Sequence, residues 1–586
     1  MRSLDDIVDL YHQRRLAQGP VHEEMRRVRD LANGDVVVPL NELDRNAKTN
    51  VANLLVQGLD QMSMRVSSTM PSPFFPPIKE GSETAKKMAR MRKKALLSFW
   101  DDNRMQMKLR RRARHLLAYS QSPVFLKPDF KTLTPKWTVR NPLDTFSAPM
   151  DDDDVIPENC IFTSRVTANW LLANYGDLVG GQLRMGRVDS DSRYTLLEYV
   201  CADSIQLAIL GAEDNPELNP AERAGLEAIL LEAIPNRTGM PLAVVPQRIT
   251  LDKPRGQFDG VLGMYYTRAR LQALTEIAIE RGIFPEEYLV ARPGENPEIL
   301  QLADGKSGIL GVVKGGDIQQ LQLNPGYKTD TALDRLERQE RLEGAIPAEF
   351  GGESATNIRT GRRGETVLAA TVDYRVQEAQ EVFANSLLHE DKIAIAIEKA
   401  YWGNTSKSFF IPSRTSVGQE TYTPNKVWQT DFHYVAYSAA GSDVNNLIIG
   451  LGQRLGVGLM SKESAREADP LISDPDFEHD RIIAEGVEEA LLQSIQQQAA
   501  NPQGPYQPDD LAYLTKLVVE QDVPLFEAVR RTNQRAQDRQ AQAMPQGSPE
   551  TMPGLAMPGM GAEAPVEAGM AGGPPPIEQL LAQLGG

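Results

Sequence analysis

One helical segment, from about Thr331 to Leu342, limits most strongly what this chain can fold into. Its only large apolar residues are Leu333, Leu336 and Leu342, and most of its other positions are polar or charged. The segment stops at Gly344, a residue type that commonly ends helices. A helix with so narrow an apolar face is not stable alone, so it requires a neighbour to pack against.

A β-rich stretch precedes this helix, and another helix precedes that stretch. The earlier helix is predicted from about Val261 to Arg281, where Gly282 and the following Pro285 form a typical stop signal. Residues 287–326 are short runs of strand-forming residues separated by glycine-containing turns. The chain therefore runs from a helix through a β-rich insert into a second helix.

The regions before these two helices predict an α+β arrangement. The first 120 or so residues have helical periodicity, including one long helix from about Ser82 to Tyr119. Short strands begin near Pro123, and a helix near Ala168–Tyr175, with Thr167 placed to cap it, interrupts them. With 586 residues, the chain is long enough for three or four structural units.

The regions after the two helices are mainly helical. A long helix is expected from about Glu365 to Tyr401, then a small β-rich piece, then a helical block at about Val444–Gln542. Inside that block, Asp474 and Pro475 predict a helix start, and one face of that helix is expected to carry Ile483, Val487, Leu491 and Ile495. Residues beyond Met544 are rich in Pro, Gly, Met and Ala and are expected to be disordered. The fold class is therefore α+β, mainly α.

The net charge of the chain narrows the range of functions it could have. The chain has 79 acidic and 63 basic residues, a net charge of −16. A protein that binds DNA tightly carries an excess of Lys and Arg, so the acidity argues against a DNA-binding regulator and suits a conduit through which DNA slides.

Two cysteines, Cys160 and Cys201, are too few for a disulfide framework and fit a reducing compartment. We expect neither a signal peptide nor a membrane span, hence a soluble, intracellular product.

One basic stretch stands out against this acidity. The expected helix at Ser82–Tyr119 carries the runs KKMARMRKK and KLRRRARH. They could form a nucleic-acid surface, or simply a solvated or subunit-facing helix side. The second interpretation is favoured because apolar positions suited to packing are interspersed: Met88, Met91, Ala95, Phe99, Met107 and Leu116.

The residues do not predict an enzyme. The six histidines are scattered, without metal-ligand spacing. Gly305-Lys306-Ser307 lacks the earlier glycine of a phosphate loop and is read as a hairpin turn, and the glycines from Gly450 to Gly456 are read as a loop. Asp151–Asp154 is read as an exposed acidic turn because the EF-hand glycine and glutamate are missing. We therefore expect no catalytic residue, no metal site and no cofactor.

Four stretches resemble tailed-bacteriophage portal (head–tail connector) proteins, and they occur in portal order between about 120 and 500. The first resembles the portal wing, the second the passage from wing to stem, the third the channel loop and helix start, and the fourth the first crown helices. They read VRNPLDTFSAPMDDDDVIPENCIFTSRVTANWLLANYG, NRTGMPLAVVPQRI with GQFDGVLGMYYTRARLQALT, IPAEFGGESATNIRTGRRGE, and GLMSKESAREADPLISDPDFEHDRIIAEGVEEALL. Each is weak alone, and their order is more specific than any one of them.

The resemblance implies a ring subunit, usually one of twelve, with wing, stem, clip and short helical crown layers. The implied boundaries are wing 1–260, first stem helix 261–283, β-rich clip 284–327, second stem helix 328–344, channel loop 345–364, wing again 365–443, crown 444–544 and a disordered tail 545–586. The implied function is a channel at one capsid vertex for packaging and ejecting double-stranded DNA. The implied location is the virion, with assembly in the host cytoplasm.

The resemblance also implies partners and candidate contact residues. Its partners would be further copies of the chain, the terminase motor, the head–tail adaptor, the major capsid or scaffolding protein, and DNA passing through; no membrane is involved. Arg359, Arg362 and Arg363 of the channel loop are candidates for transient phosphate contacts, or for pairing with acids of a neighbouring subunit. The alternatives are another virion structural protein, such as a minor head or adaptor subunit, and, less favoured, a nuclease.

Overall fold

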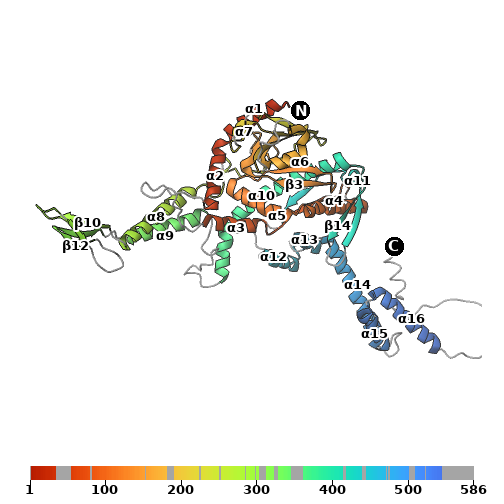
Figure 1. Ribbon diagram of the computed structural model, residues 1–586. Coiled ribbons are helices and arrows are strands. Elements are labelled where there is room, and N and C mark those ends of the chain that lie inside the picture. Colours follow the sequence, from red (N-terminus) through yellow and green to blue (C-terminus); the bar gives the residue numbers. More distant parts are fainter. Residues whose placement is uncertain are drawn as a thin grey trace, which may run out of the picture. The chain divides into compact units, whose positions relative to one another are not determined.

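The computed structural model combines helices with several small antiparallel sheets, and helices predominate (Figure 1). This agrees with the expected α+β, mainly α fold class. The chain divides into two compact units, Met1–Pro475 and Asp476–Gly586. The structure describes residues 2–34, 54–79, 82–151, 154–180, 191–218, 220–223, 226–249, 253–283, 286–296, 298–301, 312–321, 327–344, 361–412, 417–437, 444–469, 472, 475–500, 508–521 and 523–543.

Helices make up about half of the described residues of the first unit. They are α1 (Leu4–Ala17), α2 (Gly19–Asn33), α3 (Leu54–Val66), α4 (Glu83–Asp102), α5 (Met105–Tyr119), α6 (Ala168–Val179), α7 (Pro220–Arg223), α8 (Leu262–Ile283), α9 (Tyr327–Glu343), α10 (Gly361–Trp402), α11 (Pro424–Val427), α12 (Val444–Gly456) and α13 (Lys462–Ala468). The Thr167 cap predicted for α6 is confirmed, because its Oγ1 accepts a hydrogen bond from the Trp170 amide at 3.3 Å.

The strands of this unit form separate sheets. A five-stranded antiparallel sheet has the order β4 (Thr145–Ser147), β5 (Asn159–Thr167), β6 (Arg193–Cys201), β7 (Ser204–Ile209) and β8 (Ile229–Pro235). A three-stranded sheet joins β3 (Thr134–Val139), β2 (Val124–Asp129) and β9 (Ala243–Val244). Two-stranded sheets pair β1 (Ser72–Phe74) with β16 (Tyr434–Ala436) and β14 (Lys407–Pro412) with β15 (Val417–Tyr422).

The five-stranded sheet is covered on both faces, and strand β6 shows why. Tyr194 and Leu196 point to one face, where they pack with residues of α6. Leu197 and Tyr199 point to the other face, where they pack with residues of α1. A strand buried on two sides needs apolar residues in both registers, which the sequence RYTLLEYVC supplies.

The predicted single helix at Ser82–Tyr119 is instead two helices, α4 and α5. The break lies at Arg104, whose φ of 51° is left-handed and cannot continue a helix. The neighbouring Asn103 is buried and fixes the break to strand β3: its Nδ2 donates to the Pro135 carbonyl at 2.9 Å and its Oδ1 accepts from the Trp137 amide at 3.0 Å. These long-range hydrogen bonds override the helical preference of the local sequence.

The second unit is helical. It contains α14 (Pro475–Ala500), α15 (Pro508–Thr515), a π-helix (Lys516–Glu520) and α16 (Leu525–Ala543). Its small core consists of Ile495, Leu514, Leu517, Ala528, Val529 and Ala536. Of the apolar face predicted for α14, Ile495 is fully buried whereas Ile483 is 51% exposed. Only the end of that face therefore lies in the core; Asp474 and the tail beyond Met544 lie outside the described residues.

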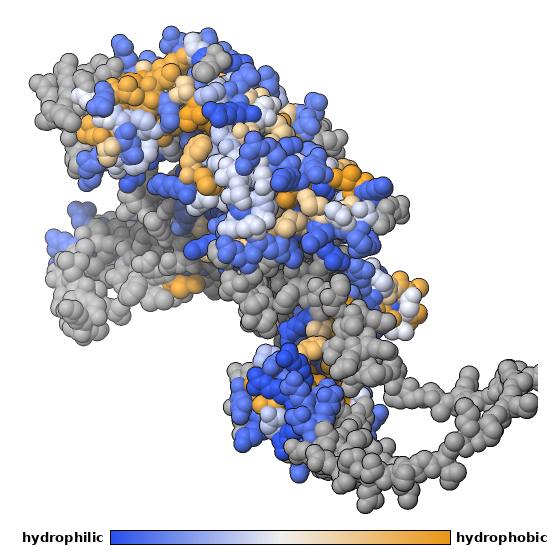
Figure 2. All heavy atoms as spheres, turned by 90° about the vertical axis from the view of Figure 1, so that its right-hand side faces the viewer, coloured by the Kyte–Doolittle hydropathy of each residue, from blue (hydrophilic) through white to orange (hydrophobic). Residues whose placement is uncertain are grey.

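The described surface is mixed in character. On the face drawn in Figure 2, hydrophilic residues dominate and apolar residues gather in separate patches. Within the described ranges, the helices are all too short or too polar to cross a membrane.

Candidate functional site

The predicted order of helix, β-rich insert and helix is present. Helices α8 and α9 lie side by side (Figure 1), and between them the chain forms β10 (Glu286–Ala291), β11 (Glu298–Gln301), β12 (Val312–Lys314) and β13 (Gly316–Leu321). We call Leu262–Glu343 the α8–α9 segment. The expectation that the polar helix α9 needs a neighbour is met by α8.

The strands of this segment are nested. The outer pair, β10 and β13, is antiparallel from Glu286 opposite Leu321 to Ala291 opposite Gly316. The inner pair, β11 and β12, lies within the loop that β10 and β13 enclose in the sequence. Gly315 connects β12 to β13 with a φ of 76°, and a Cβ there would lie 3.0 Å from the Asn296 carbonyl oxygen, so this turn requires glycine.

The base of α8 is anchored by apolar contacts. Phe258, Val261, Tyr265 and Ala269 are buried against Leu31 of α2 and Leu55 of α3. Beyond Ala269 the described residues of α8 are half-buried or exposed, as Leu274 and Ile279 illustrate. The α8–α9 segment is therefore fixed to the rest of the first unit mainly through the first turns of α8.

A buried ion pair joins the two helices near this base. Arg268 Nε of α8 lies 2.8 Å from Glu340 Oε2 of α9, and the Glu340 side chain has no exposed surface. Burial raises the pKa of Glu340 to about 7, although the neighbouring Arg268 opposes the shift. Close by, Gln257 Nε2 donates to the Gly344 carbonyl oxygen at 3.0 Å, which fixes the end of α9.

Two of the three predicted channel residues, Arg362 and Arg363, lie at the start of α10. Arg359 falls outside the described residues, as does most of the loop 345–364. Helix α10 begins at Gly361, one turn earlier than the predicted start at Glu365, so Arg362 and Arg363 belong to its first turn. That turn contains no acidic residue. Two cations at the positive end of a helix dipole are unfavourable unless an anion approaches.

The second half of α10 is buried and carries acids that pair with basic side chains. Arg112 of α5 donates to both carboxylate oxygens of Glu390, at 2.6 and 3.0 Å, and to Ser386 Oγ at 2.9 Å. The Arg112 and Glu390 side chains are 1% and 0% exposed. This bidentate pair connects α10 to α5 inside the main apolar core.

Two further acids of α10 have polar partners in the same core. Trp100 Nε1 donates to Asp391 Oδ1 at 2.9 Å, and His433 Nε2 lies 3.5 Å from Asp391 Oδ2. Complete burial raises the pKa of Asp391 to about 6. Glu398 accepts from Lys407 Nζ, from the Tyr422 hydroxyl at 3.1 Å and from Trp428 Nε1 at 3.3 Å. Helix α10 is therefore held by directional contacts along its buried half.

Some basic residues of the two runs on α4 and α5 are buried and form contacts that stabilise the fold. Arg92 is buried and donates to the Val427 carbonyl oxygen at 2.8 Å, and Arg112 pairs with Glu390 as described. Of the apolar positions predicted to pack, Ala95, Phe99 and Leu116 are buried and Met88 and Met91 are partly buried. Met107 is 69% exposed, so it does not pack in the core of this chain.

The residues considered for chemistry remain dispersed where they are described. No group of three or more His, Cys, Asp or Glu side chains suited to a metal ion occurs in the described ranges. Gly305-Lys306-Ser307 and two residues of Asp151–Asp154 fall outside those ranges. The loop predicted at Gly450–Gly456 is wrong: these residues belong to α12, whose flanking apolar residues, including the buried Leu451, sustain the helix.

Comparison with protein-family models gives no match for this sequence, and a search of curated proteins gives none either.

Proposed function

We propose that this chain is the subunit of a portal-type ring: a channel at one capsid vertex of a tailed bacteriophage through which double-stranded DNA is packaged and ejected. The observation that carries the proposal is the α8–α9 segment, two packed helices connected by nested strands, followed by the long helix α10. The four portal-like stretches in the sequence occur in the matching order.

In this proposal the parts of the chain correspond to portal layers. Helices α8 and α9 are the stem, the nested strands between them the clip, and the helices from α12 onward a short crown. The remaining elements before α8 and after the start of α10 are the wing. The clip would meet the terminase motor and later the head–tail adaptor.

The net charge of the chain supports the proposal that DNA passes through it as through a conduit. The chain carries a net charge of −16, which disfavours tight retention of DNA over the whole surface. Arginines gathered at the N-terminus of α10, where the helix dipole is positive, suit brief contacts with passing phosphates. DNA could then slide because few contacts hold it at any moment.

Imaging of the purified full chain by negative-stain electron microscopy tests the ring. The proposal expects closed rings with a central channel wide enough for duplex DNA. A monomeric or irregular particle over a wide range of protein concentration and salt would overturn it and favour a different virion protein.

The arginines are tested separately, by changing Arg359, Arg362 and Arg363 to Ala together. Rings should still form, but packaging and retention of DNA should fall. Changing the same three residues to Lys is the matched control, because it keeps the charge and should preserve most packaging. Normal packaging by the Ala variant would remove the proposed DNA contact while leaving the ring proposal intact.

A further inference from the structure

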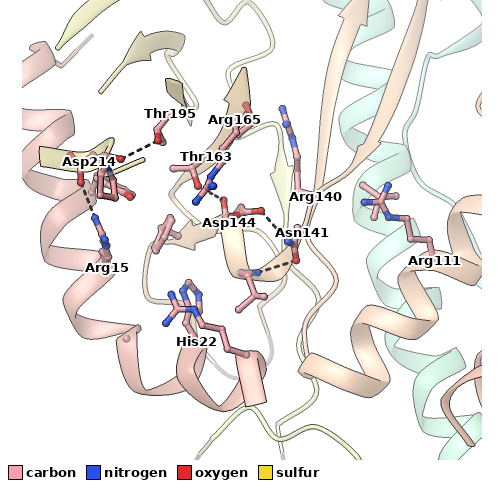
Figure 3. Close-up of a pocket in the computed structure, with 18 residues that line it drawn as sticks. Arg15, His22, Arg111, Arg140, Asn141, Asp144, Thr163, Arg165, Thr195 and Asp214 are labelled. Carbon is pink, nitrogen blue, oxygen red and sulfur yellow. Dashed lines mark hydrogen bonds and ion pairs between the residues drawn. The ribbon is translucent and has the colours of Figure 1, made fainter. Parts of the chain in front are cut away.

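Two pairs of histidine and aspartate in this chain can be compared, and they differ in what surrounds the aspartate. In the first pair, His12 Nε2 lies 3.3 Å from Asp214 Oδ2, and the His12 side chain is 38% exposed. Asp214 lines the cavity drawn in Figure 3, where Arg15 Nη1 lies 2.8 Å from Asp214 Oδ1. The negative charge of Asp214 is therefore balanced by an arginine.

The second pair, Asp391 of α10 and His433, lies inside the core of the first unit. His433 Nε2 is 3.5 Å from Asp391 Oδ2, and both side chains are 0% exposed. Neither of these two atoms has a hydrogen-bond partner among the described residues. Trp100 Nε1 donates to the other carboxylate oxygen at 2.9 Å, but an indole carries no charge. Within the described ranges, no lysine or arginine forms an ion pair with Asp391.

The contacts of the His433 ring fix where its hydrogen lies. Nδ1 is 2.7 Å from the Asp431 carbonyl oxygen, and because a carbonyl only accepts, Nδ1 carries the hydrogen. In a neutral ring the lone pair then remains on Nε2, which faces Asp391 Oδ2. An ionised Asp391 would place a second acceptor against this lone pair and bury an uncompensated charge. One further proton between the two atoms removes both problems, whichever atom holds it.

The other charged groups near this pair do not replace that proton. Glu390, the neighbour of Asp391 on α10, is paired with Arg112 of α5 at 2.6 Å. Burial raises the pKa of Asp391 and the charge of Glu390 acts in the same direction, whereas His433 and Trp100 oppose the shift. Because the net shift is upward, the folded chain holds the proton more tightly than the unfolded chain does.

His433 connects the pair to the sheet formed by β1 and β16. It precedes Tyr434, the first residue of β16, and Tyr434 lies opposite Phe74 of β1. The ring of Phe75, the next residue after β1, stacks on the His433 ring with centroids 4.9 Å apart and an interplanar angle of 16°. A two-stranded sheet is at best marginally stable alone, so this one depends on its contacts with α10 and the core.

We propose that Asp391 and His433 share one proton that locks the β1–β16 sheet against α10, and that the sheet opens locally when this proton is lost. The folded-state pKa of the acid is raised, so the lock is closed at low pH and opens as the pH rises through that pKa. The His12–Asp214 pair forms no such lock, because Arg15 keeps its charge and balances Asp214 after any proton is lost. The lock belongs to the core of one chain and does not depend on ring formation.

Hydrogen exchange of the full chain at a series of pH values, followed by mass spectrometry, measures the opening. Protection factors remove the intrinsic pH dependence of amide exchange. For residues 70–76 and 430–437 we expect protection to fall roughly tenfold or more between about pH 5 and pH 8. In Asp391→Asn protection should stay high and nearly constant, because an amide N–H can donate to His433 Nε2 and does not titrate.

His12→Gln is the matched control, since it removes the other histidine–aspartate pair and leaves Arg15 beside Asp214. It should reproduce the pH dependence of the unchanged chain. Constant protection of the sheet in the unchanged chain, the same pH dependence in Asp391→Asn, or its loss in His12→Gln would overturn the proposal. An equal fall of protection in β2 would also overturn it, because the core would then open as a whole. This last comparison is made within the unchanged chain and requires no variant to fold.

Discussion

The buried half of α10 and the α8–α9 segment are held in place in different ways. Around α10, three acids pair with basic or polar groups from α4, α5, β14 and the residues near β16 inside a large apolar core. Among its described side chains, the α8–α9 segment has one buried ion pair and a small apolar cluster at its base. The first region is specified by many contacts at once, whereas the described contacts of the second are concentrated at its base. Substitutions should therefore affect folding in the first region and association in the second.

The largest effect is expected at the Arg112–Glu390 pair. Arg112→Ala leaves the Glu390 carboxylate buried without its bidentate partner, which costs about 3–5 kcal/mol of unfolding free energy. Urea unfolding followed by tryptophan fluorescence measures the loss.

A double variant, Arg112→Met with Glu390→Leu, provides the control. It removes both charges and should recover much of the stability, because apolar residues of similar size can replace a buried pair. A loss below about 1 kcal/mol in the single variant would mean that α10 is not fixed by this pair.

The next effect concerns pH and Asp391. Because burial raises its folded-state pKa to about 6, above an ordinary value of ~3.9, the folded chain holds this proton more tightly than the unfolded chain. The resulting stabilisation is present below about pH 4 and is lost as the pH rises through about 6, by roughly 3 kcal/mol in all. Asp391→Asn should remove this part of the pH dependence. Parallel stability curves for the two proteins between pH 4 and 7 would contradict the assignment.

A smaller, local effect is expected in the α8–α9 segment. Arg268→Ala removes the partner of Glu340, but that carboxyl can take up a proton because its pKa is already near 7, so the cost should be about 2 kcal/mol. Hydrogen exchange should accelerate in α8 and α9 and stay unchanged in the buried half of α10. Acceleration in both regions would show that they unfold as one unit.

The smallest effect is expected among the nested strands. Arg292 and Asp317 form a pair at 3.0 Å, but their side chains are 61% and 64% exposed. Arg292→Ala should leave the melting temperature unchanged because exposed ion pairs contribute little. A measurable drop would show that the outer strand pair, β10 and β13, depends on this contact.

Many helices could be predicted from the sequence because apolar periodicity, caps and stop residues lie within the helix or next to it. The stop at Gly282 and the apolar periodicity placed α8, α9 and α10 to within about a turn, and Thr167 identified the start of α6. The start of α10 was predicted too late because the residues before Glu365 carry glycines that usually indicate a loop.

Features that depend on distant contacts could not be predicted in this way. The break at Arg104 depends on hydrogen bonds from Asn103 to β3, and the Arg112–Glu390 pair joins residues 278 positions apart. Such side chains look like surface charges until the fold brings their partners together.

The length of α10 has a mechanical consequence. The first buried apolar residue described in α10 is Val376, whereas Gly361 begins the same helix about 15 residues earlier, roughly 22 Å along the axis at 1.5 Å per residue. A continuous helix moves as one rigid body, so a rotation of its buried half also moves its N-terminal end. A rotation of about 5° in the buried half would displace the end that carries Arg362 and Arg363 by roughly 2 Å on that length scale. Small adjustments of core packing would thus become movements large enough to make or break a hydrogen bond.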